Sequence, residues 1–159
     1  MNSVSMVSSS NGWAVGFQGA IQRWDGNAWA TVSSPADPID GVLDSVAMVS
    51  FSNGWAVGYD GTILHWDGSA WTNFSSPTDS ELFFVTMVSS NDGWAVGDYG
   101  DFLHWNGTAW TGIHNPTRVG VISIAMDSPT DGWAVGRNGV ILHYGPVYQA
   151  YLPAVRKAQ

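Results

Sequence analysis

Short runs of alternating apolar and polar residues follow one another along the chain, with turn residues between them. Within one stretch the runs cover residues 45–50, 55–57, 62–66 and 71–74. Period-two alternation rich in β-branched and aromatic residues predicts β-strands. The separators are Ser52-Asn53-Gly54, Asp60-Gly61 and Asp67-Gly68. Because Asn-Gly and Asp-Gly readily adopt the positive φ of tight hairpin turns, the stretch is predicted to form a four-stranded antiparallel meander.

The same pattern occurs four times. The motif Gly-Trp-Ala-Val-Gly recurs at successive spacings of 42, 39 and 39 residues and supplies Trp13, Trp55, Trp94 and Trp133. A second aromatic series at the same spacings contains Trp24, Trp66, Trp105 and Tyr144. A third series contains Trp29, Trp71 and Trp110, and its fourth position is Gln149. A fixed period of this length is typical of folds built from one repeated supersecondary unit.

A meander of this size cannot cover both of its own faces, but blades arranged around an axis cover one another. We therefore predict an all-β fold of the β-propeller type, with four tandem four-stranded antiparallel blades of 39–42 residues. The domain is expected to span residues 1–152, with blades at about 1–41, 42–80, 81–119 and 120–152. Residues 147–152 would form the outer strand of the last blade, and residues 153–159 a C-terminal tail.

The tryptophans are predicted to form the core between blades. In Trp55-Ala56-Val57 the two large side chains share one face of the strand, and the small alanine on the other face lets the next blade approach closely. The predicted core tryptophans are Trp13, Trp55, Trp94, Trp133, Trp24, Trp66 and Trp105. The third series begins the outermost strand, so it is expected to be partly exposed.

The repeat resembles the Asp-box (BNR-like) propeller repeats, and most closely those of the photosystem II assembly-factor propellers. The residues that carry the resemblance in the second repeat are 54–58 (GWAVG), Gly61, 63–68 (ILHWDG) and Trp71. The resemblance implies roles in assembly or interaction rather than catalytic turnover. The turn is shorter than the usual Asp-box, because Asp67 precedes Trp71 by four residues and no Ser or Thr stands two positions before it.

Four blades leave two arrangements open. Because four-bladed rings are a known architecture, we favour a ring that closes within one chain. Alternatively, open blade edges pair with a second chain, either completing a larger ring as a dimer or extending a filament.

Composition and net charge limit the classes of partner that the chain is expected to bind. Hydrophobic residues make up 45% of the chain and charged residues 11%, which excludes a disordered protein. A formal net charge of −8 repels phosphate backbones, so no nucleic acid partner is expected. The chain has no apolar run long enough for membrane insertion and no signal peptide pattern. The residues at 151–157 are similar to short ends of exported bacterial proteins, which suggests an extracellular or periplasmic location.

Candidate binding residues lie where the repeats differ, because repeat proteins usually place recognition on variable loops of a shared scaffold. The turn between the second and third strands and the connection between blades should project to one side, which we call the loop face. The turn residues predicted to bind a ligand are Phe17, Gln18, Tyr59, Asp60, Asp98, Tyr99, Arg137 and Asn138. The connections on that side carry Asp37, Asp40, Asp79, Glu81 and Arg118. Solvated, freely varying loops are the competing interpretation.

No catalytic or metal-binding pattern stands out. Nucleotide, metalloprotease and serine hydrolase motifs are absent from the sequence, and cysteine is absent. His65, His104 and His143 occupy equivalent positions, with Arg23 in the first repeat, but the repeat symmetry separates them, so hydrogen-bonded structural histidines are expected. The sequence thus predicts no enzyme, no cofactor and no metal site.

The first functional hypothesis is a non-catalytic extracytoplasmic propeller that recognises a protein or a glycan through its loop face. The second is a structural module that self-assembles as a homo-oligomer through open blade edges. A glycoside hydrolase is the third, because paired aspartates could act as its acids, yet nothing in the sequence positions such a pair.

Overall fold

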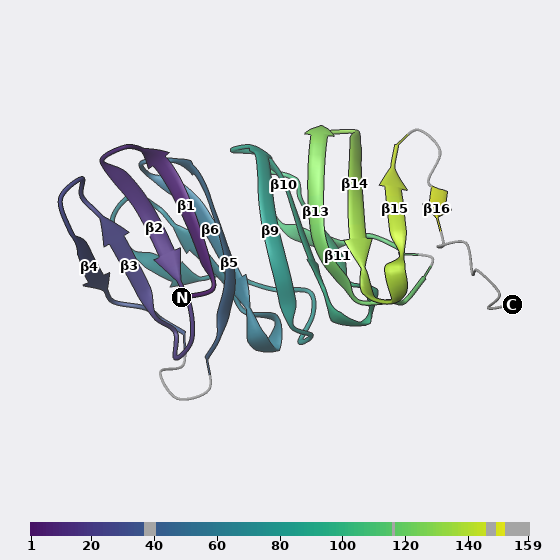
Figure 1. Ribbon diagram of the computed structural model, residues 1–159, viewed down its shortest axis with the longest axis horizontal. Helices are drawn as coiled ribbons and strands as arrows, with labels where there is room; N and C mark the ends of the chain where they lie inside the picture. The colour runs from purple at the N-terminus through teal and green to yellow at the C-terminus, as the bar shows by residue number, and fades with distance from the viewer. Residues whose placement is uncertain (37–40, 116, 146–148, 152–159) are drawn as a thin grey trace, which may run out of the picture.

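The computed structural model describes residues 1–36, 41–115, 117–145 and 149–151, and it consists of four antiparallel sheets (Figure 1). Blade 1 contains β1 (Ser3–Ser8), β2 (Asn11–Val15), β3 (Ile21–Trp24) and β4 (Trp29–Val32). Blade 2 contains β5 (Leu43–Ser50), β6 (Asn53–Gly58), β7 (Ile63–Trp66) and β8 (Trp71–Asn73). Blade 3 contains β9 (Leu82–Ser89), β10 (Asp92–Gly97), β11 (Phe102–Trp105) and β12 (Trp110–Gly112). Blade 4 contains β13 (Val121–Ser128), β14 (Asp131–Gly136), β15 (Ile141–Tyr144) and β16 (Gln149–Tyr151).

Each sheet is a meander whose strands pair in chain order, so the predicted all-β, propeller-type fold with four four-stranded blades is confirmed. Short 3₁₀ turns join the second and third strands of the last three blades, at η1 (Tyr59–Gly61), η2 (Asp98–Gly100) and η3 (Arg137–Gly139). The outer strand β16 lies inside the segment predicted for it. The predicted tail at 153–159 lies outside the described residues.

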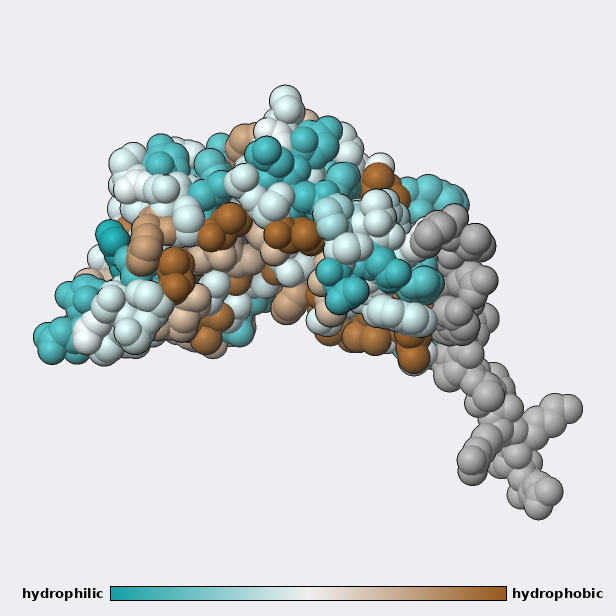
Figure 2. All heavy atoms as spheres, turned by 90° about the horizontal axis from the view of Figure 1, so that it is seen from above, coloured by the Kyte–Doolittle hydropathy of each residue, from teal (hydrophilic) through white to brown (hydrophobic). Residues whose placement is uncertain are grey.

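The blades stand side by side in an arc (Figures 1 and 2). Their innermost strands pack in sequence, β1 against β5, β5 against β9 and β9 against β13. Blade 1 and blade 4 lie at opposite ends of the arc (Figure 1). Our preference for a ring closed within one chain is therefore wrong. Four blades close a ring only if each is turned by a quarter of a circle from the last, and in this arc the successive turns do not add up to a full circle (Figure 1).

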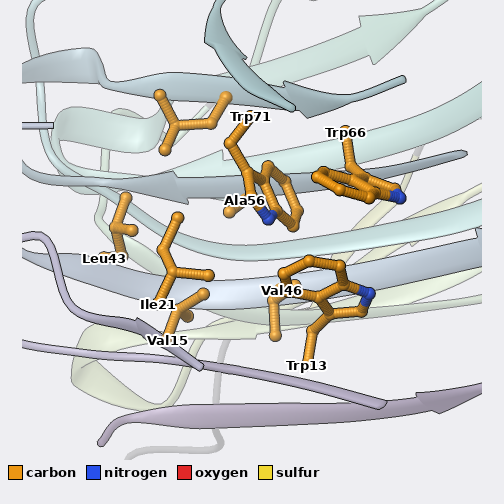
Figure 3. Packing of buried hydrophobic residues seen from close by; sticks show 9 residues of the cluster. Trp13, Val15, Ile21, Leu43, Val46, Ala56, Trp66 and Trp71 are labelled. Atoms are coloured by element: carbon orange, nitrogen blue, oxygen red, sulfur yellow. The ribbon is translucent and has the colours of Figure 1, made fainter. Parts of the chain in front are cut away.

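Every interface joins unlike faces of two blades. The tryptophan face of a blade carries the Trp and Val of its second strand and the apolar residue that opens its third strand. The alanine face carries the Ala of the second strand. Trp13, Val15 and Ile21 on the tryptophan face of blade 1 pack against the alanine face of blade 2 (Figure 3). The residues they meet are Leu43, Val46, Ala56, Leu64, Trp66 and Trp71. The predicted division of large and small side chains between the two faces is confirmed, and it repeats at both later interfaces.

Aromatic rings cross each interface in a repeated geometry. Trp13 lies 4.5 Å from Trp66 and 5.4 Å from Trp71, between ring centroids (Figure 3). Blades 2 and 3 reproduce both distances closely, at 4.6 Å and 5.4 Å. Because Trp71 reaches back to the preceding blade, it is only 4% exposed, as is Trp110. The expectation of partial exposure holds only for Trp29, at the free side of blade 1, which is 42% exposed.

The opposite side of each second-strand tryptophan is covered from within its own blade. His65 lies 4.3 Å from Trp55 between ring centroids, and its Nε2 is 3.1 Å from Asn53 Oδ1. His104 and His143 repeat the stacking and hydrogen bond an aspartate of the same blade. In blade 1 the guanidinium of Arg23 lies over Trp13 instead. The conserved geometry indicates a structural role for these histidines.

In blades 1 to 3, hydrogen bonds stabilise the turn between the first and second strands and the turn between the third and fourth strands. The indole N–H groups of Trp24, Trp66 and Trp105 each donate to a turn carbonyl at 3.0 Å. In the next turn, Asp67 Oδ1 accepts the backbone N–H groups of Ser69 and Ala70. These bonds lower the pKa of Asp67 to about 2, because they stabilise its charged form.

The turn predicted at Ser52-Asn53-Gly54 lies earlier in the chain than the sequence indicates. Asn53 and Gly54 belong to β6, so Gly54 is a strand residue and the turn lies before it. A side chain at Gly54 would collide with Met48 Sδ, and the same Gly–Met contact recurs in the other three blades. The glycine that opens each GWAVG motif therefore has no positive φ, and a side chain there would have to displace the flexible end of the methionine.

One predicted core tryptophan is not buried. Trp133 is 47% exposed, whereas Trp13, Trp55 and Trp94 are buried. The reason is its position at the end of the arc, where no further blade of the described chain lies against the tryptophan face of blade 4 (Figure 1). Trp24, on the free alanine face of blade 1, is half-buried for the same reason.

Candidate binding surface on the loop face

The turn between the second and third strands has a left-handed middle residue in every blade. The φ of this residue is 57° at Gln18, 51° at Asp60, 51° at Tyr99 and 58° at Asn138. A glycine with positive φ follows each of them. This conformation is uncommon for residues other than glycine, asparagine and aspartate, and it turns the middle side chain outward. Tyr99 is accordingly 76% exposed.

Turns and blade connections meet on one side of the molecule, as predicted for the loop face. The N–H of Asp98 donates to the carbonyl of Glu81 just before β9, at 2.9 Å. A side chain at Gly100 would collide with the backbone of Arg118, which belongs to the connection between blades 3 and 4. The buried Asn115 fixes that connection, because its Nδ2 donates to the carbonyl of Gly100 at 3.0 Å.

A hollow of about 330 Å³ lies on the loop face between the turns of blades 3 and 4. It is lined by Asp98, Tyr99, Arg118, Val119, Gly120, Arg137 and Asn138. Arg137 Nη1 donates to Asp98 Oδ1 at 2.9 Å, and its guanidinium lies over the ring of Phe83. These two contacts hold the Arg137 head in place at the edge of the hollow.

Arg118 supplies the second guanidinium of this hollow. It is exposed, and its own backbone is left-handed, with φ of 52°. Arg118 forms no ion pair with any residue that the structure describes. The hollow therefore presents positive charge on a chain whose net charge is −8.

The structure brings together half of the predicted binding residues. Asp98, Tyr99, Arg137 and Asn138 line the hollow between blades 3 and 4. Phe17 and Gln18 line a separate hollow of about 360 Å³ beside the turn of blade 1. Tyr59 and Asp60 line neither of the two. Asp37 and Asp40 lie outside the described residues.

Sequence reasoning missed the lining residues Arg118, Val119 and Gly120 as members of the site. Arg118 was noticed as a charge on the connection, but its left-handed backbone has no signal in an Arg-Val-Gly sequence. Among the described residues there is no group of three His, Cys, Asp or Glu side chains that could hold a metal ion. No helix in the described part of the chain is long and apolar enough to span a membrane.

Comparisons with known proteins show the fold and leave the function open. No family model and no curated protein matches the chain. A solved structure of YCF48 bound to D1 peptide is 18% identical with a TM-score of 0.74, over 95% of this chain and 54% of that one. YCF48 from Cyanidioschyzon merolae is 18% identical with a TM-score of 0.72, over 96% of this chain and 56% of that one. The chain thus spans little more than half the length of two β-propellers whose fold it shares.

Proposed function

We propose that this chain is a non-catalytic protein-binding propeller segment that holds an acidic peptide segment on its loop face. The observation that carries the proposal is the hollow between blades 3 and 4, which is lined by Arg118, Arg137 and the exposed Tyr99. Guanidinium groups bind carboxylates through paired hydrogen bonds, and an exposed tyrosine supplies contact area at low entropic cost.

Two further points favour binding over catalysis. Asp98 is the only carboxylate among the residues that line the hollow, and it is already paired with Arg137, whereas glycoside hydrolysis uses two carboxyl groups across the bond. A YCF48 structure of similar fold contains a D1 peptide. An extracytoplasmic location is part of the proposal, to be tested by fractionation of the source cells.

The test uses a library of synthetic peptides with acidic, neutral and basic sequences, measured by fluorescence anisotropy. Acidic peptides should bind the chain, and binding should weaken with added salt. Arg118→Gln should weaken binding about tenfold by removing the free guanidinium, and Tyr99→Ala should weaken it by a similar factor. Arg23→Gln is the matched control, because it removes the same charge from a strand position stacked on Trp13.

Equal affinity of the wild type and Arg118→Gln for every peptide would refute the site. A glycan is the second candidate ligand, because the Tyr99 ring is exposed enough to stack on a sugar. Binding to a glycan array that is lost in Tyr99→Ala but kept in Arg118→Gln would favour the glycan over the peptide.

A further inference from the structure

The tryptophan face of blade 4 is an interface face that no described blade covers. Trp133 and Val135 are each 47% exposed, and Ile141 is 43% exposed. Their counterparts Trp13, Val15 and Ile21 in blade 1 are all fully buried against blade 2. The same three positions are buried in blades 2 and 3.

The alanine face of blade 1 is the complementary half of such an interface, at the other end of the arc. Val4, Met6 and Trp29 on this face are exposed. In blade 2 the counterparts of Val4 and Trp29 are Val46 and Trp71, which blade 1 buries. Figure 2 shows the arch from above, with hydrophobic atoms in brown within its left half and along its lower edge at right.

The shape of blade 1 matches the side chains that blade 4 presents. A hollow of about 360 Å³ on blade 1 is lined by Met1, Asn2, Ser3, Val4, Ala14 and Trp29. On blade 2 the equivalent place is filled by Val15 and Ile21 of blade 1 (Figure 3). Val135 and Ile141 occupy the positions of Val15 and Ile21 in the repeat, so they have the size and spacing to fill the hollow on blade 1.

The aromatic pair of blade 1 already has the geometry of a finished interface. Trp24 and Trp29 lie 5.6 Å apart with an interplanar angle of 43°. The equivalent pairs in blades 2 and 3 lie 5.9 Å and 5.8 Å apart, at 43° and 39°, with a tryptophan of the preceding blade against them. Trp133 is the remaining second-strand tryptophan, and it is already stacked on one side by His143.

A serine on the inner strand adds a polar contact with a fixed register. Ser3 Oγ accepts the backbone N–H of Val46 across the first interface at 3.2 Å. Ser45 Oγ accepts the N–H of Val85 across the second, also at 3.2 Å. Ser123 is the counterpart of these serines in blade 4, and Val4 is the counterpart of Val46 and Val85.

We propose that a second copy of this chain covers both faces, with blade 4 of each copy packed on blade 1 of the other. Two such contacts related by a two-fold axis close a ring of eight blades, which lies within the range of known propellers. This chain covers 54% and 56% of the two YCF48 structures of the same fold, so two copies together have a length comparable to one such propeller. The contact is head to tail, because the tryptophan face fits an alanine face and not a second tryptophan face.

The first measurement is solution mass by light scattering across a dilution series. The wild type should have twice the 17.0 kDa mass of one chain. Val135→Asp and Val4→Asp should each give monomers, because every interface between the two copies contains Val135 of one copy and Val4 of the other. Mixing the two variants should give a dimer that contains one copy of each. In that dimer, blade 4 of the Val4→Asp copy packs on blade 1 of the Val135→Asp copy, and this interface contains neither substitution.

Several results would overturn the proposal. A monomeric wild type would exclude the second copy, and a mass that grows with concentration would indicate a filament instead of a ring. If Val4→Asp alone still dimerised, the contact would join like faces, and if mixing failed to restore the dimer, the two faces would not be partners.

Two controls protect the test against misfolding and against the peptide site. Val4→Thr and Val135→Thr keep β-branched side chains and strand propensity, and each should weaken the dimer about tenfold without loss of the β-sheet circular dichroism signal. Tyr99→Ala lies on the loop face and should leave the mass unchanged. Failure of peptide binding and failure of assembly are therefore separate results.

Discussion

At the scale of single residues, the glycine that closes each GWAVG motif lies where a side chain has no room. Gly97 lies at the end of β10 with an extended backbone, and a side chain there would collide with the carbonyl oxygen of Glu81. Gly58 meets the carbonyl of Val42 in the same way. Each of these carbonyl groups accepts a backbone hydrogen bond from the turn, at Asp98 and at Tyr59, so it cannot move aside without breaking that bond.

Gly97→Ala should therefore lower the free energy of unfolding by about 3 kcal/mol, as expected for overpacking against backbone. Gly112→Ala is the matched control, because a side chain at Gly112 meets no atom within 4 Å. Its unfolding free energy should change by less than about 0.5 kcal/mol. Urea denaturation of both variants checks this, and equal losses would contradict the steric explanation.

Asp44 on β5 is a second residue whose contribution to folding stability depends on its surroundings. Burial, with the nearby charge of Glu81, raises its pKa to about 6. Its Oδ2 is buried without a hydrogen-bond partner, and Oδ1 accepts a long bond from Asn2. A pKa raised in the folded state means that folding opposes the charged form, so stability is lost as the pH rises from about 4 through 6.

Asp44→Asn should raise the free energy of unfolding at pH 7.5 by about 1 kcal/mol, a value reduced for the solvent that still reaches this half-buried group. At pH 4 the carboxyl is largely neutral, so the variant should show little gain. Thermal unfolding at the two pH values is the measurement. A gain of the same size at both would show that the charge is not the cause.

At the scale of elements, the first two interfaces combine apolar packing with one or two hydrogen bonds between inner strands. Ser5 Oγ accepts the N–H of Met48 at 3.1 Å, beside the Ser3 bond. The interface between blades 2 and 3 has the single buried serine Ser45, which is 2% exposed. The bond satisfies the N–H of Val85, whose strand β9 has no pairing partner on its inner side.

Ser45→Ala should lower the free energy of unfolding by about 1–3 kcal/mol, because it leaves a buried N–H without a partner. Ser9→Ala changes an exposed turn residue and should have an effect below about 0.5 kcal/mol. Denaturant unfolding measures both, and amide exchange at Val85 reports the lost bond directly. An unchanged exchange rate at Val85 would show that the serine is not its partner.

At the scale of the whole molecule, the blades differ in how many neighbouring blades pack against them. Among the described residues, blades 2 and 3 have a neighbouring blade on both faces, and blade 4 on one. In repeat proteins stability is close to a sum of units and neighbour contacts, so an end unit with one neighbour opens more easily.

In the monomeric Val4→Asp variant, amide hydrogens of β14 should exchange faster than those of β6 by about tenfold or more. In the wild-type dimer proposed above, the two strands should approach equal protection, because blade 4 gains a neighbour. Hydrogen exchange with mass spectrometry measures both. Equal exchange of β6 and β14 in the monomer would show that the arc unfolds as one unit.

The amino-acid pattern was enough to predict the repeat, the four strands of each blade and which face carries Trp and which Ala, because these depend on local periodicity and on turn residues. It also marked the turns that form the loop face. It did not predict the arc, the exposure of Trp133, the burial of Trp71 or the place of Arg118 in one hollow with Arg137, all of which depend on tertiary packing. The physical reason is that a repeat motif is the same whether or not a neighbour follows it. Burial, blade angle and the meeting of distant loops depend on what lies next in space.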